Sequence, residues 1–279
     1  MYTNRVAVIL LNWRNYSDTL ECIYSIVSSG IDLRDVIVVD NDSQNESVNI
    51  IRRSIPDLEI LESGHNGGFA YGCNAGIRIA LERDYEYIWL LNNDTLINIQ
   101  TLPQMLNIFS EENSREIGIV GSLIRYLEFP YEIQALGGGS INYLTGQTKN
   151  ILEFGNLDKL DYITGASMLI SRKVFEEIGL LDEGYFMYWE DVEFCVRAQK
   201  AGFGIAVATD SLVLHKEGAS VGSEDPRKIL IQNKAQTKFF CSYSKIWPVP
   251  LLIYSLGRSI KSILRGNLET AKYFWRGRL

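Results

Sequence analysis

Histidine, cysteine and proline are scarce in this chain, whose 279 residues include two, four and six of them. The four cysteines (Cys22, Cys73, Cys195 and Cys241) are scattered, and no CxxC pair occurs. The N-terminus also lacks an apolar stretch of the signal-peptide kind. These absences favour a reducing compartment, so we expect a cytoplasmic protein. With 46% hydrophobic residues, the chain can bury one large core, or one domain plus an appendage.

Long apolar runs are missing from the C-terminal part, where the longest, residues 246–256, is interrupted by Pro248 and Pro250 and is too short to span a bilayer. Residues 227–279 contain eleven lysines and arginines against one acid, while the remainder has 16 basic and 33 acidic residues. Basic residues mixed with aromatic and aliphatic ones predict peripheral contact with the inner face of the cytoplasmic membrane. Packing on the main domain, or on a second subunit in a homodimer, is the alternative. The acidic remainder argues against nucleic-acid binding.

The first hundred residues alternate apolar runs with helical patterns. We predict strands at 5–11, 35–40, 58–61 and 85–91, and helices at 17–28, 46–54 and 76–83. Strands that alternate with helices imply a mostly parallel sheet with helices on both faces. Right-handed crossovers then bring Asn12, Asp40 and residues 92–94 to one edge of that sheet.

The pattern changes after Gly121. Glycines 137–139 and residues 142–146 predict turns between short antiparallel strands. Further on we predict strands at 162–170, 204–208 and 211–214, and helices at 173–178 and 190–201. The chain is expected to divide into a domain of residues 1–222 and a basic, aromatic-rich helical region of residues 223–279.

Short polar side chains follow the second predicted strand. Asp40 and Asp42, with Asn12 on the neighbouring strand, can accept or donate hydrogen bonds to a base or ribose at a sheet edge. A helix N-cap is the plainer explanation, since Asp42 or Ser43 suits that role as well.

A glycine-rich stretch occupies residues 64–76. Its small residues would let the backbone approach an anionic ligand, and Asn66 and Asn74 are the polar groups we expect to contact it. The spacing is not the GxGxxG fingerprint, and tight packing of a helix on a sheet would explain these glycines equally well.

Asn92, Asn93 and Asp94 follow directly after an apolar, strand-like run. A carboxylate in this position suits a hard cation such as Mg²⁺ or Mn²⁺, with substrate phosphate supplying further oxygen ligands. His215, after another short strand, could complete the metal shell as a neutral imidazole. A capped turn and a structural histidine are the respective alternatives.

A second acidic pair, Glu190 and Asp191, follows the aromatic stretch 185–189. Aromatic residues make a dry, rigid wall, and one carboxylate would abstract a proton from a hydroxyl nucleophile. Acids in the first turn of a helix are also favoured by the helix dipole, so a structural role stays open. Thr164 and Gly165 would leave room for a sugar ring or simply allow close packing.

The segments VAVILLNW, VIVVDNDS, NGGFAYGCNAGI, YIWLLNNDT, TGASMLISR and GYFMYWEDVEFCVRAQKAGF occur in this order over roughly residues 5–220. Together they resemble the inverting family 2 glycosyltransferases, and within that family the chain looks most like bacterial rhamnosyltransferases of surface-polysaccharide assembly. The resemblance implies an α/β fold of the GT-A type, with a Rossmann-like nucleotide-binding mixed sheet flanked by helices. The C-terminal region would be a helical appendage.

The resemblance also implies a nucleotide-sugar donor, a dTDP- or UDP-sugar with rhamnose as the expected sugar, and a bound Mg²⁺ or Mn²⁺. Asn93 and Asp94 fall where the family has its DxD-type motif, although Asn92 replaces the first acid. Asp40 matches the base-contacting acid, and His215 falls where many members place an extra metal or diphosphate contact.

Asp191 matches the family's catalytic base, and Glu190 would position the base or the acceptor. The acceptor would be a hydroxyl of a saccharide or of a lipid-linked molecule. Two other functions remain as alternatives: a sugar-phosphate nucleotidyltransferase and a non-catalytic nucleotide-sugar-binding scaffold. The first would need a glycine-rich basic loop after the first strand, where this chain instead has residues 12–15, Asn-Trp-Arg-Asn.

Overall fold

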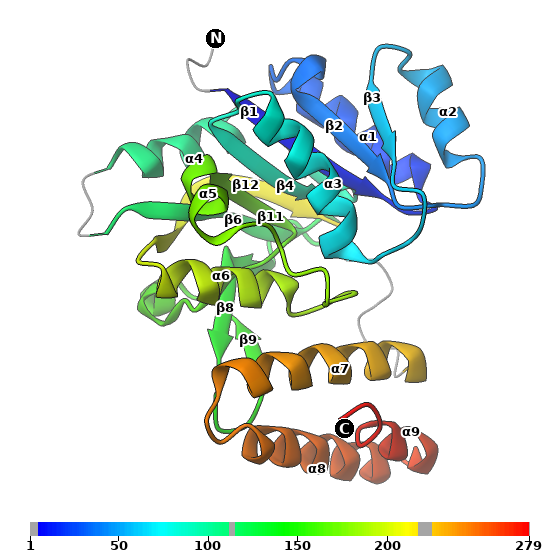
Figure 1. The fold of residues 1–279 in the computed structure, drawn as a ribbon, viewed down its shortest axis with the longest axis vertical. Helices are drawn as coiled ribbons and strands as arrows, with labels where there is room; N and C mark the ends of the chain where they lie inside the picture. Colours follow the sequence, from blue (N-terminus) through cyan, green and yellow to red (C-terminus); the bar gives the residue numbers. More distant parts are fainter. Residues whose placement is uncertain (1–4, 112–114, 217–224, 279) are drawn as a thin grey trace.

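The computed structural model describes residues 5–111, 115–216 and 225–278. Within these ranges a nine-stranded mixed sheet forms the centre of the molecule, with helices on both faces (Figure 1). In spatial order the strands are β3 (Glu59–Glu62), β2 (Val36–Asp40), β1 (Val6–Asn12), β4 (Tyr87–Asn92), β11 (Ser167–Ser171), β6 (Ile117–Tyr126), β12 (Gly204–His215) and β5 (Thr95–Ile97), with β7 (Ile133–Leu136) paired to β6. The α/β class expected from the sequence is confirmed.

Strands β3, β2, β1 and β4 are parallel, as their continuous apolar runs predict. All five residues of β2 are buried, because helices cover both faces of the sheet there. The register places Asn12 beside Asp40 and Leu11 beside Asn92. The polar residues at the carboxyl ends of these strands therefore share one edge, as expected.

Six helices cover the faces of the sheet in the described residues. They are α1 (Tyr16–Ser28), α2 (Ser47–Ser54), α3 (Phe69–Glu82), α4 (Thr101–Ser110), α5 (Arg172–Ile178) and α6 (Glu190–Lys200). Helices α3, α5 and α6 pack on one face and α1, α2 and α4 on the other, which gives two apolar cores separated by the sheet. Short 3₁₀ turns, η1 (Leu33–Asp35) and η2 (Phe154–Lys159), lie between these elements.

Helix α3 begins at Phe69, well before the start that we predicted at Gly76. Gly68 makes the early start possible, because its φ of 92° lies in the left-handed region that favours glycine. A Cβ on Gly72 would lie 2.3 Å from Leu11 of β1, and one on Gly76 would lie 2.8 Å from Ile9. The glycines within this helix thus serve close helix–sheet packing.

The middle of the chain differs from the sequence-based prediction in several places. Gly138 and Gly139 lie in strand β8 (Gly138–Ile141) and not in a turn. The strand needs glycine at position 138, because a Cβ there would lie 1.8 Å from the carbonyl oxygen of Tyr162. The predicted strand 162–170 is broken into β10 (Tyr162–Ile163) and β11. The two predicted strands at 204–214 form one strand, β12, with an irregularity between Ala208 and Leu212. Strand β10 joins β8 and β9 (Thr148–Asn150) in a small second sheet.

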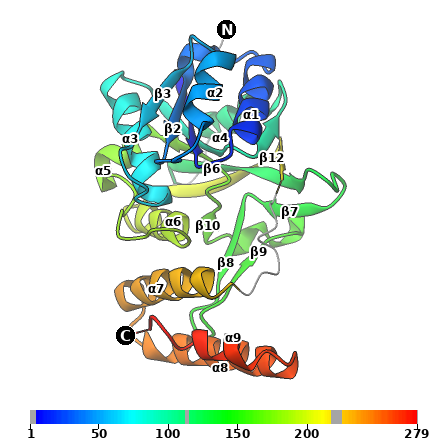
Figure 2. The same ribbon diagram turned by 90° about the vertical axis from the view of Figure 1, so that its right-hand side faces the viewer.

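Three C-terminal helices, α7 (Pro226–Tyr243), α8 (Pro248–Leu264) and α9 (Leu268–Tyr273), stack beneath the main body (Figure 2). Pro248 occupies the first turn of α8, where its missing N–H costs nothing, so the prolines start this helix and do not interrupt it. The predicted division between residues 222 and 223 lies outside the described residues. Across the three described ranges, no helix has the length and apolarity needed to cross a membrane.

Candidate active site

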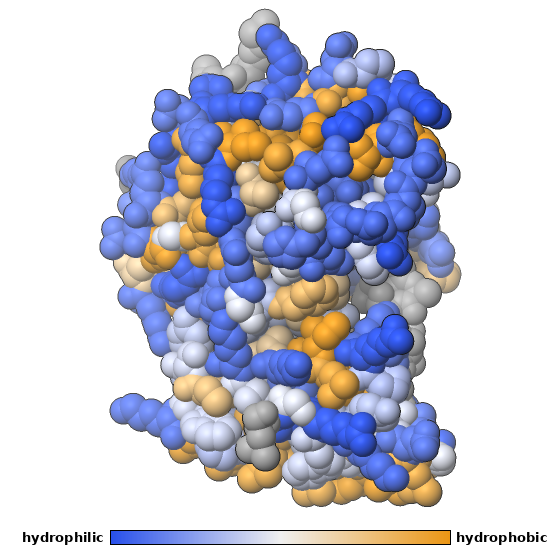
Figure 3. Space-filling view, turned by 45° about the vertical axis from the view of Figure 1, so that its right-hand side comes forward, coloured by the Kyte–Doolittle hydropathy of each residue, from blue (hydrophilic) through white to orange (hydrophobic). Residues whose placement is uncertain are grey.

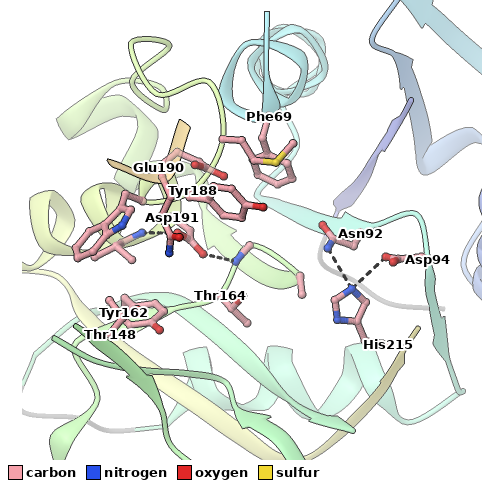
Figure 4. A pocket seen from close by; sticks show the side chains of 16 residues that line it. Phe69, Asn92, Asp94, Thr148, Tyr162, Thr164, Tyr188, Glu190, Asp191 and His215 are labelled. Carbon is pink, nitrogen blue, oxygen red and sulfur yellow. Dashed lines mark hydrogen bonds and ion pairs between the residues drawn. The ribbon is translucent and has the colours of Figure 1, made fainter. Parts of the chain in front are cut away.

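A cleft of about 460 Å³ opens between the carboxyl ends of β4 and β12 and the N-terminus of α6 (Figure 4). Its walls combine carboxylates, amides and aromatic rings. The lining residues are Phe69, Asn92, Asp94, Thr148, Tyr162, Thr164, Gly165, Ala166, Met187, Tyr188, Trp189, Glu190, Asp191, Val192, His215 and Gln232. Asp94 and Asp191, almost a hundred residues apart in sequence, thus line the same cleft.

One side of the cleft carries a carboxylate–imidazole pair. His215 Nε2 lies 3.1 Å from Asp94 Oδ1 and 3.3 Å from Asn92 Nδ2. The other ring nitrogen, Nδ1, lies 2.8 Å from Gln134 Oε1, which fixes the plane of the ring. Burial tends to raise the pKa of Asp94, but the hydrogen bond and charge of His215 outweigh it and hold that pKa below its ordinary value. Asp94 is therefore an anion over the whole physiological pH range.

This pair fits a divalent cation that has further ligands from a substrate. Among the described residues no group of three or more histidine, cysteine, aspartate or glutamate side chains could hold a metal by itself. Asp94 and His215 offer one carboxylate oxygen and one imidazole nitrogen on the cleft wall. A histidine whose second nitrogen donates to an amide oxygen has the supported geometry common among metal ligands. The remaining coordination positions would face the cleft, where phosphate oxygens could fill them.

Asp191 lies on the other side of the cleft, in the first turn of α6. Its Oδ2 accepts a hydrogen bond of 3.0 Å from the backbone N–H of Gly165, and its Oδ1 accepts one of 2.8 Å from that of Val192. Burial raises the pKa of Asp191 above its ordinary value, although these N–H groups act to lower it. Each oxygen keeps a further lone pair, so the carboxylate is held in place yet able to accept a proton.

Glu190 is more deeply buried than its neighbour and lies on the same wall. Burial, and then the charge of Asp191, raise the pKa of Glu190 well above its ordinary value. Its Oε2 has no hydrogen-bond partner among the described residues. A buried carboxyl oxygen without a partner inside a cleft is a natural contact for a ligand hydroxyl.

The backbone just before this acidic pair is strained. Tyr188 and Trp189 have φ values of 70° and 69°, which residues other than glycine rarely adopt. Such strain persists where surrounding contacts enforce it, and it gathers at functional sites. Here the Trp189 ring packs 4.8 Å from the ring of Phe239 and 5.6 Å from that of Phe240, both on α7. The C-terminal helices thus support the turn that presents Glu190 and Asp191.

Three residues predicted to bind the nucleotide lie outside this cleft, at the ends of β1 and β2. Asn12 Nδ2 donates to Asp40 Oδ1 at 2.6 Å, and the other oxygen of Asp40 accepts from the N–H of Ser43 at 2.9 Å. Asn12 and Asp40 are almost fully buried. Asp42 is more open and accepts from Gln44. Asn12 and Asp40 therefore shape the loop that follows β2, while their predicted contact with a ligand stays a prediction.

The other amides predicted to bind the nucleotide also have protein partners. Asn66 Oδ1 accepts from Asn41 Nδ2 at 3.0 Å, and Asn93 Nδ2 donates to Thr19 Oγ1 at 2.8 Å. The fully buried Asn74 donates to the carbonyl of Leu181 at 2.9 Å and ties α3 to the loop before α6. Thr164 and Gly165, in contrast, line the cleft as expected.

Several residues of the site escaped the sequence analysis. Gln134, which contacts His215 without lining the cleft, comes from β7, and the lining residue Thr148 comes from a hairpin whose strands are too short to give a periodic signal. Tyr162 lies at the break between β10 and β11. Gln232 lies on α7, in the region that we assigned to an appendage. These residues come together only in the folded chain, so their positions in the sequence do not reveal that they share a site.

Residues 4–236 match the sequence family described as "Glycosyltransferase like family 2". The chain is 31% identical to a low-salt glycan biosynthesis hexosyltransferase of Haloferax volcanii, over 72% of this chain and 63% of that protein. It is 26% identical to a dTDP-rhamnosyl transferase of Shigella flexneri, over 66% of this chain and 60% of that protein. It is also 26% identical to an N-acetylglucosaminyl-diphospho-decaprenol L-rhamnosyltransferase of Mycobacterium tuberculosis, over 77% of this chain and 78% of that protein. The chain thus spans less than two thirds of the first two relatives.

Solved structures share the fold. A mannosyltransferase of Pyrobaculum calidifontis, in complex with GDP-Man and Mn²⁺, has a TM-score of 0.62 at 16% identity, over 98% of this chain and 74% of that one. GalNAc-T7, with UDP, GalNAc and Mn²⁺, has a TM-score of 0.66 at 15% identity, over 97% of this chain and 53% of that one. At these identities the likeness concerns the fold alone.

Proposed function

Because the chain belongs to the family 2 glycosyltransferases and has their GT-A fold, we propose that it is an inverting enzyme that moves a sugar from a nucleoside diphosphate to an acceptor hydroxyl. The observation that carries the proposal is the placement of Asp94 and Asp191 on opposite walls of one cleft (Figure 4). One wall suits a diphosphate held through a cation, and the other suits a general base.

The donor is a dTDP- or UDP-sugar, and rhamnose is the sugar we propose. Two relatives are named as rhamnosyltransferases, one of them for dTDP-rhamnosyl transfer, which supports this choice. Asp94 and His215 would hold a Mg²⁺ or Mn²⁺ ion, and the solved relatives that bind GDP-Man or UDP contain Mn²⁺. When bound, the cation would neutralise charge on the departing diphosphate. We further propose that Asp40 and Asp42, with Asn12, Asn66, Asn74 and Asn93, shape the part of the site next to the nucleoside.

Asp191 is the proposed base. Its carboxylate takes the proton from the acceptor hydroxyl as that oxygen attacks the anomeric carbon, and the bond to the diphosphate breaks on the opposite face. The burial that raises the pKa of Asp191 makes it a better proton acceptor than an exposed aspartate. Burial and the charge of Asp191 raise the pKa of Glu190 well above its ordinary value and favour its protonated form, and we propose that its Oε2 positions a hydroxyl. One displacement inverts the configuration, and no covalent sugar–enzyme intermediate is required.

The proposed acceptor is a saccharide or a lipid-linked saccharide in surface-polysaccharide synthesis. The Mycobacterium tuberculosis relative is named for an acceptor joined to a lipid through a diphosphate, which supports the lipid-linked choice. We therefore propose a cytoplasmic protein that contacts the inner face of the membrane through its C-terminal helices. A homodimer formed through the same helices is the competing proposal.

A donor screen tests the proposed function. The full chain would be mixed with a panel of nucleotide sugars and Mg²⁺ or Mn²⁺, and thermal stabilisation and slow donor hydrolysis would be recorded. We expect a dTDP- or UDP-sugar with metal to stabilise the protein most and to be hydrolysed. Equal stabilisation by ATP or NAD would overturn the proposal, and binding without any hydrolysis or transfer would favour a scaffold.

A further inference from the structure

A second cleft, of about 350 Å³, adjoins the proposed active site. It lies between the turn of the β8–β9 hairpin and helices α7 and α8, which Figure 2 shows stacked beside that hairpin. Thr148, Trp189 and Gln232 line both clefts. A molecule bound in the second cleft could therefore extend past Trp189 to Asp191 without leaving the protein surface.

The chemistry of this second cleft suits an anion. Two cations from α8, Arg258 and Lys261, line it together with amides and a tyrosine, and its lining contains no carboxylate. Among the residues that the structure describes, the buried Nε of Arg258 has no hydrogen-bond partner, and its guanidinium carbon lies 4.9 Å from the centre of the Phe274 ring. Within the described ranges, neither side chain forms an ion pair with an acid. Two cations without an acidic partner match the two phosphates of a diphosphate in charge.

Helix α8 presents a different chemistry on its outer side. An exposed apolar strip recurs at helical spacing, on the face next to the one that lines the cleft. Its members are Val249, Leu252, Ile253, Leu256, Ile260, Ile263 and Leu264. Figure 3 shows apolar side chains along the lower edge of the molecule, where α8 lies. The surrounding residues 227–279 are strongly basic, so this outer strip suits the interface of an anionic membrane.

We propose that the second cleft binds the diphosphate of a prenyl-lipid-linked sugar, while the apolar strip of α8 rests in the membrane that holds the lipid. The order of features along the surface carries this assignment. The apolar strip comes first, then Arg258 and Lys261, then the shared wall at Trp189, and last Asp191. The lipid, the diphosphate and the sugar of such an acceptor follow one another in the same order. The inference rests on the proposed function, since it names the acceptor class of that same site.

The test compares the binding of the full chain to three kinds of vesicle. They are phosphatidylcholine vesicles, phosphatidylcholine vesicles doped with a polyprenyl diphosphate, and vesicles in which phosphatidylglycerol supplies the same surface charge. We expect the wild type to bind the polyprenyl-diphosphate vesicles at least about tenfold more tightly than the charge-matched ones. EDTA is present throughout, so that a cation at Asp94 and His215 cannot capture the diphosphate.

Two charge-matched double variants decide the site. R258Q/K261Q should lose the preference for polyprenyl diphosphate and keep the binding to phosphatidylglycerol vesicles. The control K245Q/K272Q removes the same charge from exposed positions outside the cleft and should keep the preference. A triple variant of the apolar strip, L252Q/L256Q/I260Q, should lose binding to every vesicle while soluble pyrophosphate still binds.

Equal binding of the wild type to both anionic vesicles would overturn the inference, as would equal effects of the two double variants. Donor hydrolysis with metal is measured in parallel on every variant. It should be unchanged in K245Q/K272Q, whose substituted residues lie outside both clefts. A failure of donor hydrolysis in the wild type would count against the proposed function, and a failure of lipid selectivity alone would count against the acceptor cleft.

Discussion

His215 Nδ1 lies 2.8 Å from Gln134 Oε1, while the opposite ring nitrogen faces Asp94 at 3.1 Å. Gln134 is buried and does not line the cleft, so it acts through the histidine and not on a ligand. An imidazole held at one nitrogen offers the other in a fixed direction. If His215 binds the proposed metal, Gln134 is a positioning residue, and its removal should weaken the metal-dependent binding of a nucleotide.

Gln134→Leu should weaken the metal-dependent binding of UDP or dTDP by about 10–100-fold, because the imidazole loses the acceptor that orients it. Calorimetric titration of the protein with the nucleotide, in the presence of Mn²⁺, measures the affinity. Gln134→Glu keeps an oxygen acceptor at this position and should restore most of the affinity. If nucleotide binding without metal falls by the same factor, the substitution has damaged the fold and the positioning role is refuted.

Asp191→Asn should lower the rate of sugar transfer by about 10²-fold or more, since the amide cannot take up the proton of the acceptor hydroxyl. Nucleotide affinity should stay within a few-fold, because Asp191 lies on the wall opposite Asp94. The matched control is Glu190→Gln, which keeps the shape of the side chain, removes its ionisable group and should cost much less. Wild-type turnover by Asp191→Asn would remove Asp191 as the base.

The rate should also depend on pH in a particular direction. Burial raises the pKa of Asp191, so kcat/KM should fall on acidification, with its midpoint above the ordinary pKa of an aspartate. The base works only when ionised, and protonation of Asp191 therefore switches the reaction off. A pH profile of transfer at low acceptor concentration gives the midpoint. A midpoint at or below the ordinary aspartate value would contradict the burial argument.

Glu190 should make the protein less stable as the pH rises. Burial raises the pKa of Glu190 in the folded state, so the folded protein binds this proton more tightly than the unfolded chain. The resulting stability is fully present below the unfolded-state pKa and is lost as the pH rises towards the folded-state pKa. Glu190→Gln removes the effect, and its free energy of unfolding relative to the wild type should therefore increase from acidic to neutral pH. Each unit of pKa shift corresponds to about 1.4 kcal/mol of unfolding free energy. Urea titrations of both proteins at several pH values measure the difference. Unfolding free energies of the variant and the wild type that change in parallel with pH would contradict the prediction.

Phe239 should matter for both stability and catalysis. Its ring is fully buried against Trp189, and Phe239→Ala should cost about 3–5 kcal/mol of unfolding free energy. The transfer rate should fall as well in the fraction that remains folded, because the left-handed turn at residues 188–189 loses its support. Phe129→Ala, which truncates an exposed ring, is the control and should change neither quantity. A stable Phe239→Ala enzyme with normal turnover would contradict the supporting role.

The sequence allowed the parallel half of the sheet to be predicted, because strands buried on both faces leave continuous apolar runs such as the one in β2. It also led to Asp94 and Asp191, since each acid follows an apolar or aromatic stretch that ends abruptly. Periodicity did not reveal that Asn12 binds Asp40, or that Asn74 binds the carbonyl of Leu181. A polar side chain at the end of a strand looks the same in sequence whether its partner is a ligand or the protein.

The part that the C-terminal region plays in the candidate site was the hardest feature to predict. Charge and aromatic content marked the C-terminal region as different, yet Gln232 lines the candidate active site and Phe239 packs against Trp189 in its wall. These contacts join segments that are far apart in sequence. No local pattern records such contacts.

The packing of Trp189 on α7 sets a practical rule for building chimaeras. Exchanging residues 226–278 between relatives, in order to transplant acceptor preference, would also replace Phe239 and Phe240, against which Trp189, next to the proposed catalytic pair, packs. A graft that keeps this aromatic pair and changes only the outward half of the helical stack should yield active hybrids. A graft that replaces this aromatic pair would remove the packing that supports the turn at residues 188–189, even if the new helices bind the foreign acceptor well.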